Sequence, residues 1–202
     1  MKPISSVISG LPSPAQADVS STGLQRGEHG AVTAEAARAR LVAQVPKETD
    51  RNLREWLKSS LGVVPIPQGR WMFPPSGGSY QVVTHYEFSG KLKVGRDEAW
   101  RMAQQAVGAA MTKPTREDCE EWIATLHAVT ARRADDASTL ELILNVYCGV
   151  LGRYPADVAK QVCQDFALRR EKPNWFPTLS ELDEACEKMA SERTKLAEAF
   201  GA

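Results

Sequence analysis

The sequence predicts an all-α protein, with a C-terminal bundle of four to five helices, a small helical N-terminal part and a linker rich in proline and glycine between them. Two observations predict the helices. Apolar residues recur in steps of three and four through residues 97–200, which is the period of one helix face, and helix-start signals precede several of these stretches. The linker is predicted because prolines and glycines interleave from residue 62 to residue 80 and interrupt any helical pattern.

The N-terminal part of the chain begins with residues 1–30, which are rich in Ser, Gly, Pro and Ala and have little apolar periodicity. Such a segment buries too little surface to offset the entropy of ordering, so we expect it to be disordered. The helical segment follows at residues 31–62. One helix begins near residue 34, and Pro46 should end or kink it. A second helix runs from about 48 to 61, where Gly62 is a suitable stop.

The linker spans residues 63–96 and carries Arg70-Trp71-Met72-Phe73 in its middle. We expect an extended, partly polyproline-like chain. Trp71 and Phe73 either fold back onto the chain's own helices or form a peptide that docks on a partner. Residues 81–94 are β-prone, and Ser89-Gly90 would turn them into a short hairpin, although a hairpin on its own is marginally stable.

The helical bundle domain spans residues 97–202. Thr115 and Asp118 resemble a capping box, with Asp in place of the usual Glu. The helix that ends near residue 151 is apolar nearly all round, which is typical of a helix at the centre of a bundle. The expected helix starts in this domain are Asp97, Thr115, Asp135 or Asp136, Tyr154-Pro155 and Thr178.

The last two helix starts carry the clearest local signals. Pro155 follows Tyr154 at the first helical position, where its missing N–H costs nothing, and Asp157 comes soon after. Thr178 and Glu181 form a capping box directly after Pro177. Trp175 and Phe176 precede this box, and we expect both to be buried as a hydrophobic staple that sets the entry angle of the last helix. Direct contact of these aromatics with a partner is the alternative.

The last helix also carries a seam of residues spaced alternately by three and four, with Arg193 as a misfit. Such a seam either packs on the chain's own bundle or forms a short coiled-coil homodimer. The seam residues that would form the dimer are Leu179, Leu182, Cys186, Met189 and Leu196.

Several functions are disfavoured by what the sequence lacks. No glycine-rich phosphate loop is present, the three histidines lie far apart, and the four cysteines have no metal-type spacing. We therefore expect no enzyme activity, no catalytic or cofactor-binding residues and no metal site. No apolar run approaches the roughly 20 residues of a membrane span, so we expect no membrane partner, and cysteines of this kind fit a cytoplasmic protein. The net charge is zero, with 25 residues of each sign, which argues against nucleic-acid binding through bulk charge.

A local basic cluster ends the helix that begins at Pro155. It consists of Arg169, Arg170 and Lys172. Cations at this position suit the helix dipole, so helix termination and solubility explain the cluster; contact with DNA phosphates or with an acidic partner is the alternative. Glu181 and neighbouring acidic residues begin the next helix, and phosphates would repel them there, which argues against helix-turn-helix recognition.

The segment from Tyr154 to Glu181 resembles a motif of small phage and prophage replicative-helicase loaders. In that family a Tyr-Pro pair starts one helix with an acidic residue soon after, and an aromatic-Phe-Pro-x sequence introduces another. The resemblance covers roughly residues 115–185, and Trp122 with Leu126 resembles an upstream part of it. The matching residues are Tyr154, Pro155, Asp157, Trp175, Phe176, Pro177, Thr178 and Glu181.

The resemblance implies an ATP-free, all-helical accessory protein of phage or prophage DNA replication that binds a replicative helicase. Trp71, Phe73, Arg169, Arg170 and Lys172 are the candidate partner-binding residues, and the bacterial cytoplasm is the expected location. Two other functions stay open at this point. One is a DNA-binding adaptor of the origin or packaging type, and the other is a structural or scaffold protein that uses the C-terminal seam.

Overall fold

A computed structural model describes residues 34–73, 79–131, 140–170 and 173–202. Helices make up 65% of these residues, and the rest includes a two-stranded sheet. The all-α prediction is therefore corrected to a mostly helical fold with a β-hairpin. The disorder expected for residues 1–30, the helix start expected at Asp135 or Asp136, and Lys172 lie outside the described residues.

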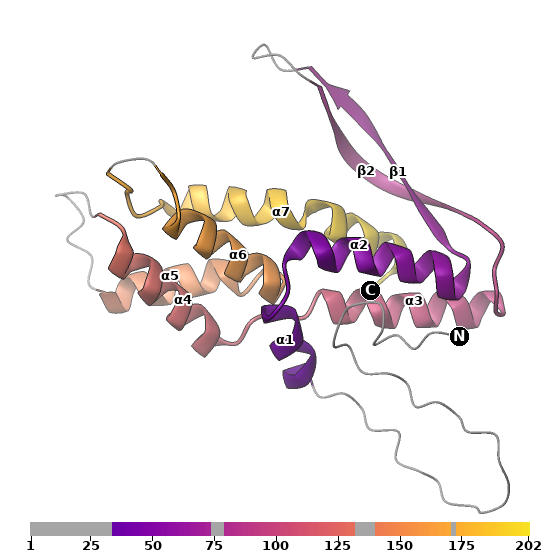
Figure 1. Cartoon of the computed structure of the whole chain (residues 1–202), viewed down its shortest axis with the longest axis horizontal. Coiled ribbons are helices and arrows are strands. Elements are labelled where there is room, and N and C mark those ends of the chain that lie inside the picture. Colours follow the sequence, from indigo (N-terminus) through magenta and orange to yellow (C-terminus); the bar gives the residue numbers. More distant parts are fainter. Residues whose placement is uncertain (1–33, 74–78, 132–139, 171–172) are drawn as a thin grey trace, which may run out of the picture.

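The described elements follow one another as helices interrupted once by the hairpin (Figure 1). Their bounds are α1 Ala34–Val42, α2 Pro46–Trp56, the π-helical turn η2 Leu57–Leu61, β1 Val64–Met72, β2 Tyr80–Ser89, α3 Arg96–Ala110, α4 Arg116–Val129, α5 Leu140–Leu151, α6 Ala156–Ala167 and α7 Leu179–Phe200.

The two predicted capping boxes are confirmed. The Thr115 hydroxyl accepts a hydrogen bond from the Asp118 N–H at 3.2 Å, and the Thr178 hydroxyl accepts one from the Glu181 N–H at 3.3 Å. In each box the acidic side chain also accepts a hydrogen bond from the N-cap backbone. These boxes satisfy backbone donors that the first turns of α4 and α7 would otherwise leave unpaired.

Three predicted helix boundaries are corrected. Pro46 begins α2 instead of ending α1, because a proline is tolerated at the first helical position. The N-cap of α3 is Gly95 instead of Asp97, which lies in the first turn. Pro155 is the N-cap of α6, one position before its predicted place.

The hairpin pairs β2 with the proline-rich segment before it, which differs from the hairpin expected at residues 81–94. β2 pairs antiparallel with β1, from Val64 opposite Ser89 to Met72 opposite Tyr80. Ser89-Gly90 ends β2 instead of turning it into a strand at 91–94, and much of the expected extended linker is β1. The ladder tolerates Pro65 and Pro67 because β1 lies at the edge of its sheet.

Two hydrophobic clusters form the interior of the helical body. The first joins α2, η2, α3, the base of β2 and the C-terminal end of α7, and it includes Leu53, Trp56, Val107 and Phe200. The second joins α4, α5, α6 and the N-terminal part of α7. Helix α7 runs along the body and contributes to both clusters (Figure 1), so residues before and after the hairpin share a core.

The predicted dimer seam of α7 faces this chain's own helices. Leu182, Cys186 and Leu196 are buried in the two clusters, and Leu179 and Met189 are half-buried. The seam therefore packs on the chain's own bundle, which was one of its two expected roles, and the side chains named for a dimer interface are largely covered within the monomer. Arg193 is buried in the same stripe.

Candidate interaction surfaces

The hairpin forms an arm that projects from the helical body (Figure 1). Near its tip, 60% of Trp71 and 76% of Phe73 is exposed. The alternative in which these aromatics fold back onto the chain's own helices is therefore wrong. The exposed large apolar residues of this arm are Ile66, Trp71, Met72, Phe73 and Val82.

The base of the arm is fixed to the body by aromatic contacts. The Phe88 ring centroid lies 5.0 Å from that of Trp100 and 4.5 Å from that of Phe200. Tyr86 is buried beside them, and its hydroxyl accepts a hydrogen bond from Arg54 at 3.5 Å. These contacts therefore attach the base of the arm to the helical body at a defined place.

A close backbone crossing also holds the base. Gly62 has a φ of 72° and Gly90 a φ of 107°, in the left-handed region that favours glycine. A Cβ on Gly62 would lie 1.9 Å from the Lys91 carbonyl oxygen, and one on Gly90 would lie 2.3 Å from the Gly62 carbonyl oxygen. Only glycines allow the two ends of the hairpin to pass this closely.

The basic turn after α6 presents two exposed arginines, Arg169 and Arg170. The Arg169 guanidinium carbon lies 3.8 Å from the ring centroid of Phe166, in a cation–π arrangement. Asn174 donates hydrogen bonds to the carbonyls of Phe166 at 3.0 Å and Ala167 at 3.3 Å, which anchors the returning chain to the end of α6.

The aromatic pair before α7 separates into one buried and one exposed side chain. Phe176 is buried against His127 and Tyr147, at centroid distances of 5.5 and 5.1 Å. The Tyr147 hydroxyl donates to the Pro177 carbonyl at 2.8 Å. Trp175 is exposed, so the expectation that both aromatics are buried is corrected. Consecutive residues of an extended segment point to opposite sides, and only one side faces the core.

Tyr154 connects the start of α6 to α7 through an acidic side chain. Its hydroxyl donates a hydrogen bond to the Asp183 carboxylate, which also accepts one from Arg153 at 2.7 Å. The hydrogen bond from Tyr154, assisted by Arg153, lowers the pKa of Asp183. Burial and the Asp183 carboxylate raise the pKa of Tyr154. Tyr154 therefore stays a neutral donor that braces two helices.

A buried cluster of charged side chains joins α7 to α6 and α2. Arg193 of α7 donates two hydrogen bonds to the Asp157 carboxylate of α6, at 2.8 and 2.9 Å. Its Nε donates to Asp50 at 2.6 Å, and its remaining two donors reach the carbonyls of Ala110 at 2.9 Å and Pro46 at 3.3 Å. Both Arg193 and Asp157 are almost fully buried. We call Arg193, Asp157 and Asp50 the arginine clasp.

The members of this clasp are far apart in the sequence, where Asp157 belongs to the Tyr-Pro motif and Arg193 is the misfit in an apolar seam. An arginine at a core position of an amphipathic helix does signal a buried partner, because an unpaired buried charge is costly. Asp50 could not be assigned as that partner, since 143 residues separate it from Arg193.

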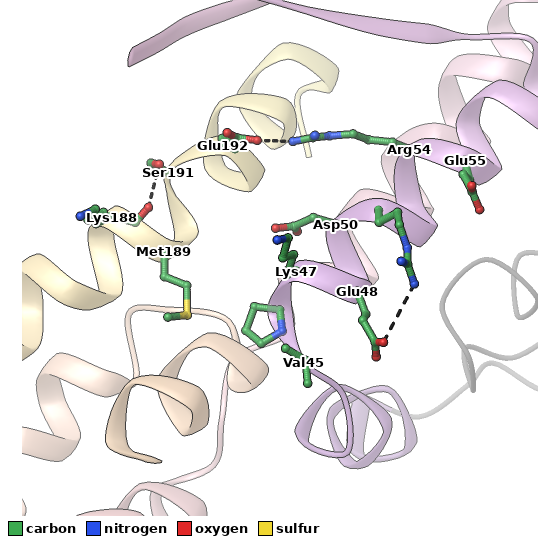
Figure 2. A pocket seen from close by; sticks show the side chains of 12 residues that line it. Val45, Lys47, Glu48, Asp50, Arg54, Glu55, Lys188, Met189, Ser191 and Glu192 are labelled. Atoms are coloured by element: carbon green, nitrogen blue, oxygen red, sulfur yellow. Dashed lines mark hydrogen bonds and ion pairs between the residues drawn. The ribbon is translucent and has the colours of Figure 1, made fainter. Parts of the chain in front are cut away.

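A groove of about 860 Å³ lies between α2 and α7. Figure 2 shows Arg54 reaching from α2 to Glu192 on α7 across one part of it. Asp50 lies in the wall of this groove. Burial raises the pKa of Asp50, although Arg193 opposes the shift. The charged side chains that line the groove are Lys47, Glu48, Asp50, Arg51, Arg54, Glu55, Lys188 and Glu192. Basic and acidic groups are equally represented, so their charge favours neither an anionic nor a cationic ligand.

The cysteines lie in surroundings that suppress thiol chemistry. Cys119, Cys163 and Cys186 are buried and free. Burial raises the pKa of Cys119 and of Cys186 to about 12 and raises that of Cys163 as well. Because the thiolate is the reactive form, these side chains act as small apolar core residues.

Among residues 34–73, 79–131, 140–170 and 173–202, no three His, Cys, Asp or Glu side chains gather in a group able to hold a metal ion. Within the same ranges, none of the helices combines the length and apolar character needed to cross a bilayer.

Comparisons of the chain with protein-family models, with curated proteins and with solved structures found no match.

Proposed function

We propose that this chain is a non-enzymatic adaptor of phage or prophage DNA replication, and that it binds a replicative helicase through its hairpin arm. The observation that carries the proposal is the exposed Trp71 and Phe73 on an arm whose base is fixed to the body. The proposed partner places the protein in the cytoplasm of the bacterial host.

The arm has the physical properties of a protein-binding element. Exposed clusters of large apolar side chains on soluble proteins commonly mark binding sites, and tryptophan is among the residues that contribute most to interface affinity. The strands Val64–Met72 and Tyr80–Ser89 of the arm are already paired as a hairpin. Less conformational entropy is then lost on binding than with a flexible peptide.

The choice of a helicase as the partner rests on the resemblance of residues 115–185 to small helicase loaders. In this chain the motif residues build the body that carries the arm. Asp157 forms the arginine clasp, Phe176 fills the second cluster, and Thr178 caps α7. The arm lies outside the resembling segment, so its assignment as the contact comes from its exposed aromatics alone.

Co-purification tests the proposal directly. The full chain is mixed at micromolar concentration with the replicative helicase encoded in the same genome or host, and the mixture is separated by size-exclusion chromatography. We expect the two proteins to elute together. Separate elution at these concentrations contradicts helicase binding.

A DNA-binding adaptor is the second candidate function, favoured by the exposed guanidinium groups of Arg169 and Arg170 at one turn. It predicts DNA binding that weakens steeply with added salt and is lost in the Arg169→Ala, Arg170→Ala double variant. Fluorescence anisotropy of labelled single- and double-stranded oligonucleotides measures this. Absent or salt-insensitive binding rules this function out.

A further inference from the structure

The two outer edges of the arm differ in the hydrogen bonds that they can offer. Among the described residues, the sheet contains β1 and β2 and no third strand, so each strand has one edge that no other strand pairs with. Pro65 and Pro67 lie within the paired part of β1. A proline has no N–H, so within a ladder it occupies positions whose nitrogen faces outward. The outer edge of β1 therefore lacks donors at two positions.

The edge of β2 has no such protection. From Tyr80 to Tyr86 the sequence reads Tyr-Gln-Val-Val-Thr-His-Tyr, without a proline or a Lys, Arg, Asp or Glu. Edge strands of stable proteins are normally blunted by prolines, charges or a covering element. The base of β2 is covered through the contact of Phe88 with Phe200 on α7, whereas Val82, Thr84 and His85 are exposed.

We propose that the edge of β2 between Tyr80 and His85 binds an extended segment of the partner protein, which becomes a third strand of the arm. This inference rests on the proposed function and names the form in which the partner is recognised. In strand addition, backbone hydrogen bonds hold the incoming chain and the neighbouring side chains select its sequence. The unblocked edge, next to an edge blocked by prolines, is the feature that favours an extended chain at β2.

The surroundings of the edge define the chemistry of that segment. Val82 is exposed. A partner strand that pairs with the outer edge of β2 would place one of its side chains beside Val82. The stretch from Tyr80 to His85 carries no Lys, Arg, Asp or Glu. The partner segment is therefore free of proline, uncharged, and apolar at alternating positions. Trp71 lies opposite Gln81 in the ladder, so the exposed aromatics and this stretch of β2 lie at the same end of the arm.

Val82 and Ile66 provide a matched pair of variants. They lie on different strands, and their exposed fractions are 44% and 39%. An incoming strand at the β2 edge is adjacent to Val82 but is separated from Ile66 by the width of β2. Val82→Lys should therefore weaken binding by about tenfold or more, because a lysine at the new contact must be desolvated, whereas Ile66→Lys should change it by less than about threefold.

The experiment uses the full chain and the replicative helicase of the same genome as the probe. Backbone hydrogen exchange is measured for both strands with and without helicase, and affinities are measured for the two variants after circular dichroism has verified their folding. We expect amides between Gln81 and His85 to become protected in the complex, with little change in β1 before Arg70.

The outcomes separate strand addition from the proposed function. A complex that leaves the β2 amides exchanging as in the free chain, and that tolerates Val82→Lys, overturns strand addition while helicase binding stands. Failure to form any complex overturns both. A concentration-dependent dimer of the free chain in light scattering, abolished by Val82→Lys, assigns the edge to a second copy and also overturns the proposal.

Discussion

Arg193 has all five of its N–H donors engaged, although it lies in the apolar stripe of α7. Its position lies between Ala190, which belongs to the second cluster, and Leu196, which belongs to the first. The clasp therefore joins the two cores at their boundary. A buried charge of this kind is tolerable only because every donor has an acceptor.

Arg193→Met should lower the free energy of unfolding by about 3–5 kcal/mol, because it leaves the Asp157 carboxylate buried without its counter-charge. Adding Asp157→Leu should recover much of this loss, since the uncompensated charge is then removed. Urea unfolding followed by circular dichroism measures both effects. The matched control is Lys195→Met at an exposed ion pair of the same helix, for which a change within about 0.5 kcal/mol is expected. An equally small effect of Arg193→Met would show that the clasp is dispensable.

Asp118 gives a prediction for pH dependence. Burial acts to raise its pKa, but hydrogen bonds from Thr115 and Arg38 outweigh it, so the pKa lies below its ordinary value of 3.8. A lowered folded-state pKa contributes stability that is complete above the ordinary value and is lost as pH falls through the folded value. Asp118→Asn should therefore cost about 1 kcal/mol at neutral pH, and this difference should shrink as the pH falls below 3.8. A difference that is constant in urea unfolding from neutral to acidic pH contradicts this assignment.

At the scale of elements, local chemistry predicted the helices better than the hairpin. The capping boxes at Thr115 and Thr178 depend on residues three positions apart, so the sequence displays them directly. The pairing of β1 with β2 depends on residues up to 25 positions apart, and proline-rich sequence in β1 resembles an unpaired linker. Tyr86 and Phe88 of β2 also pack against the body, and a local sequence pattern does not reveal such contacts.

The hairpin has a register irregularity between Gln68 and Gly69. A Cβ on Gly69 would lie 2.0 Å from the Val82 carbonyl oxygen. Gly69→Ala should therefore separate the strands at this point and speed hydrogen exchange beyond it, while the midpoint of global unfolding changes little. Gly108→Ala in α3 is the matched control, because its Cβ meets nothing within 4 Å, and it should stabilise the helix by up to about 1 kcal/mol. Unchanged exchange in Gly69→Ala would falsify the close approach.

At the scale of the whole molecule, α7 contributes to both cores, and we expect the two cores to unfold as one cooperative unit. Leu182 lies in the second cluster and Leu196 in the first. Leu182→Ala and Leu196→Ala should each cost about 2–5 kcal/mol, and each should shift one common transition. Tryptophan fluorescence and far-ultraviolet circular dichroism should therefore give the same midpoint in both variants. Two separate transitions in either variant would show that the cores unfold independently.

The candidate binding surface was only partly predictable from the sequence. Trp71 and Phe73 were candidates because they stand in a proline- and glycine-rich segment, but their exposure depends on an arm that tertiary packing creates. The clasp was not predicted, because its members come from three helices distant in sequence. Trp175 was expected to be buried and is exposed, since only its neighbour Phe176 reaches the core.

Helicase titration with paired variants tests the proposed role of the arm most directly. Binding of the full chain is measured by isothermal titration calorimetry for the wild type, for Trp71→Ser with Phe73→Ser, and for Val129→Ser with Leu168→Ser. Val129 and Leu168 lie off the arm and are 55% and 78% exposed, so they match the aromatics in exposure. We predict a loss of at least about 100-fold for the arm variant and a change within about threefold for the control. An arm variant that binds the helicase as tightly as the wild type contradicts the proposal.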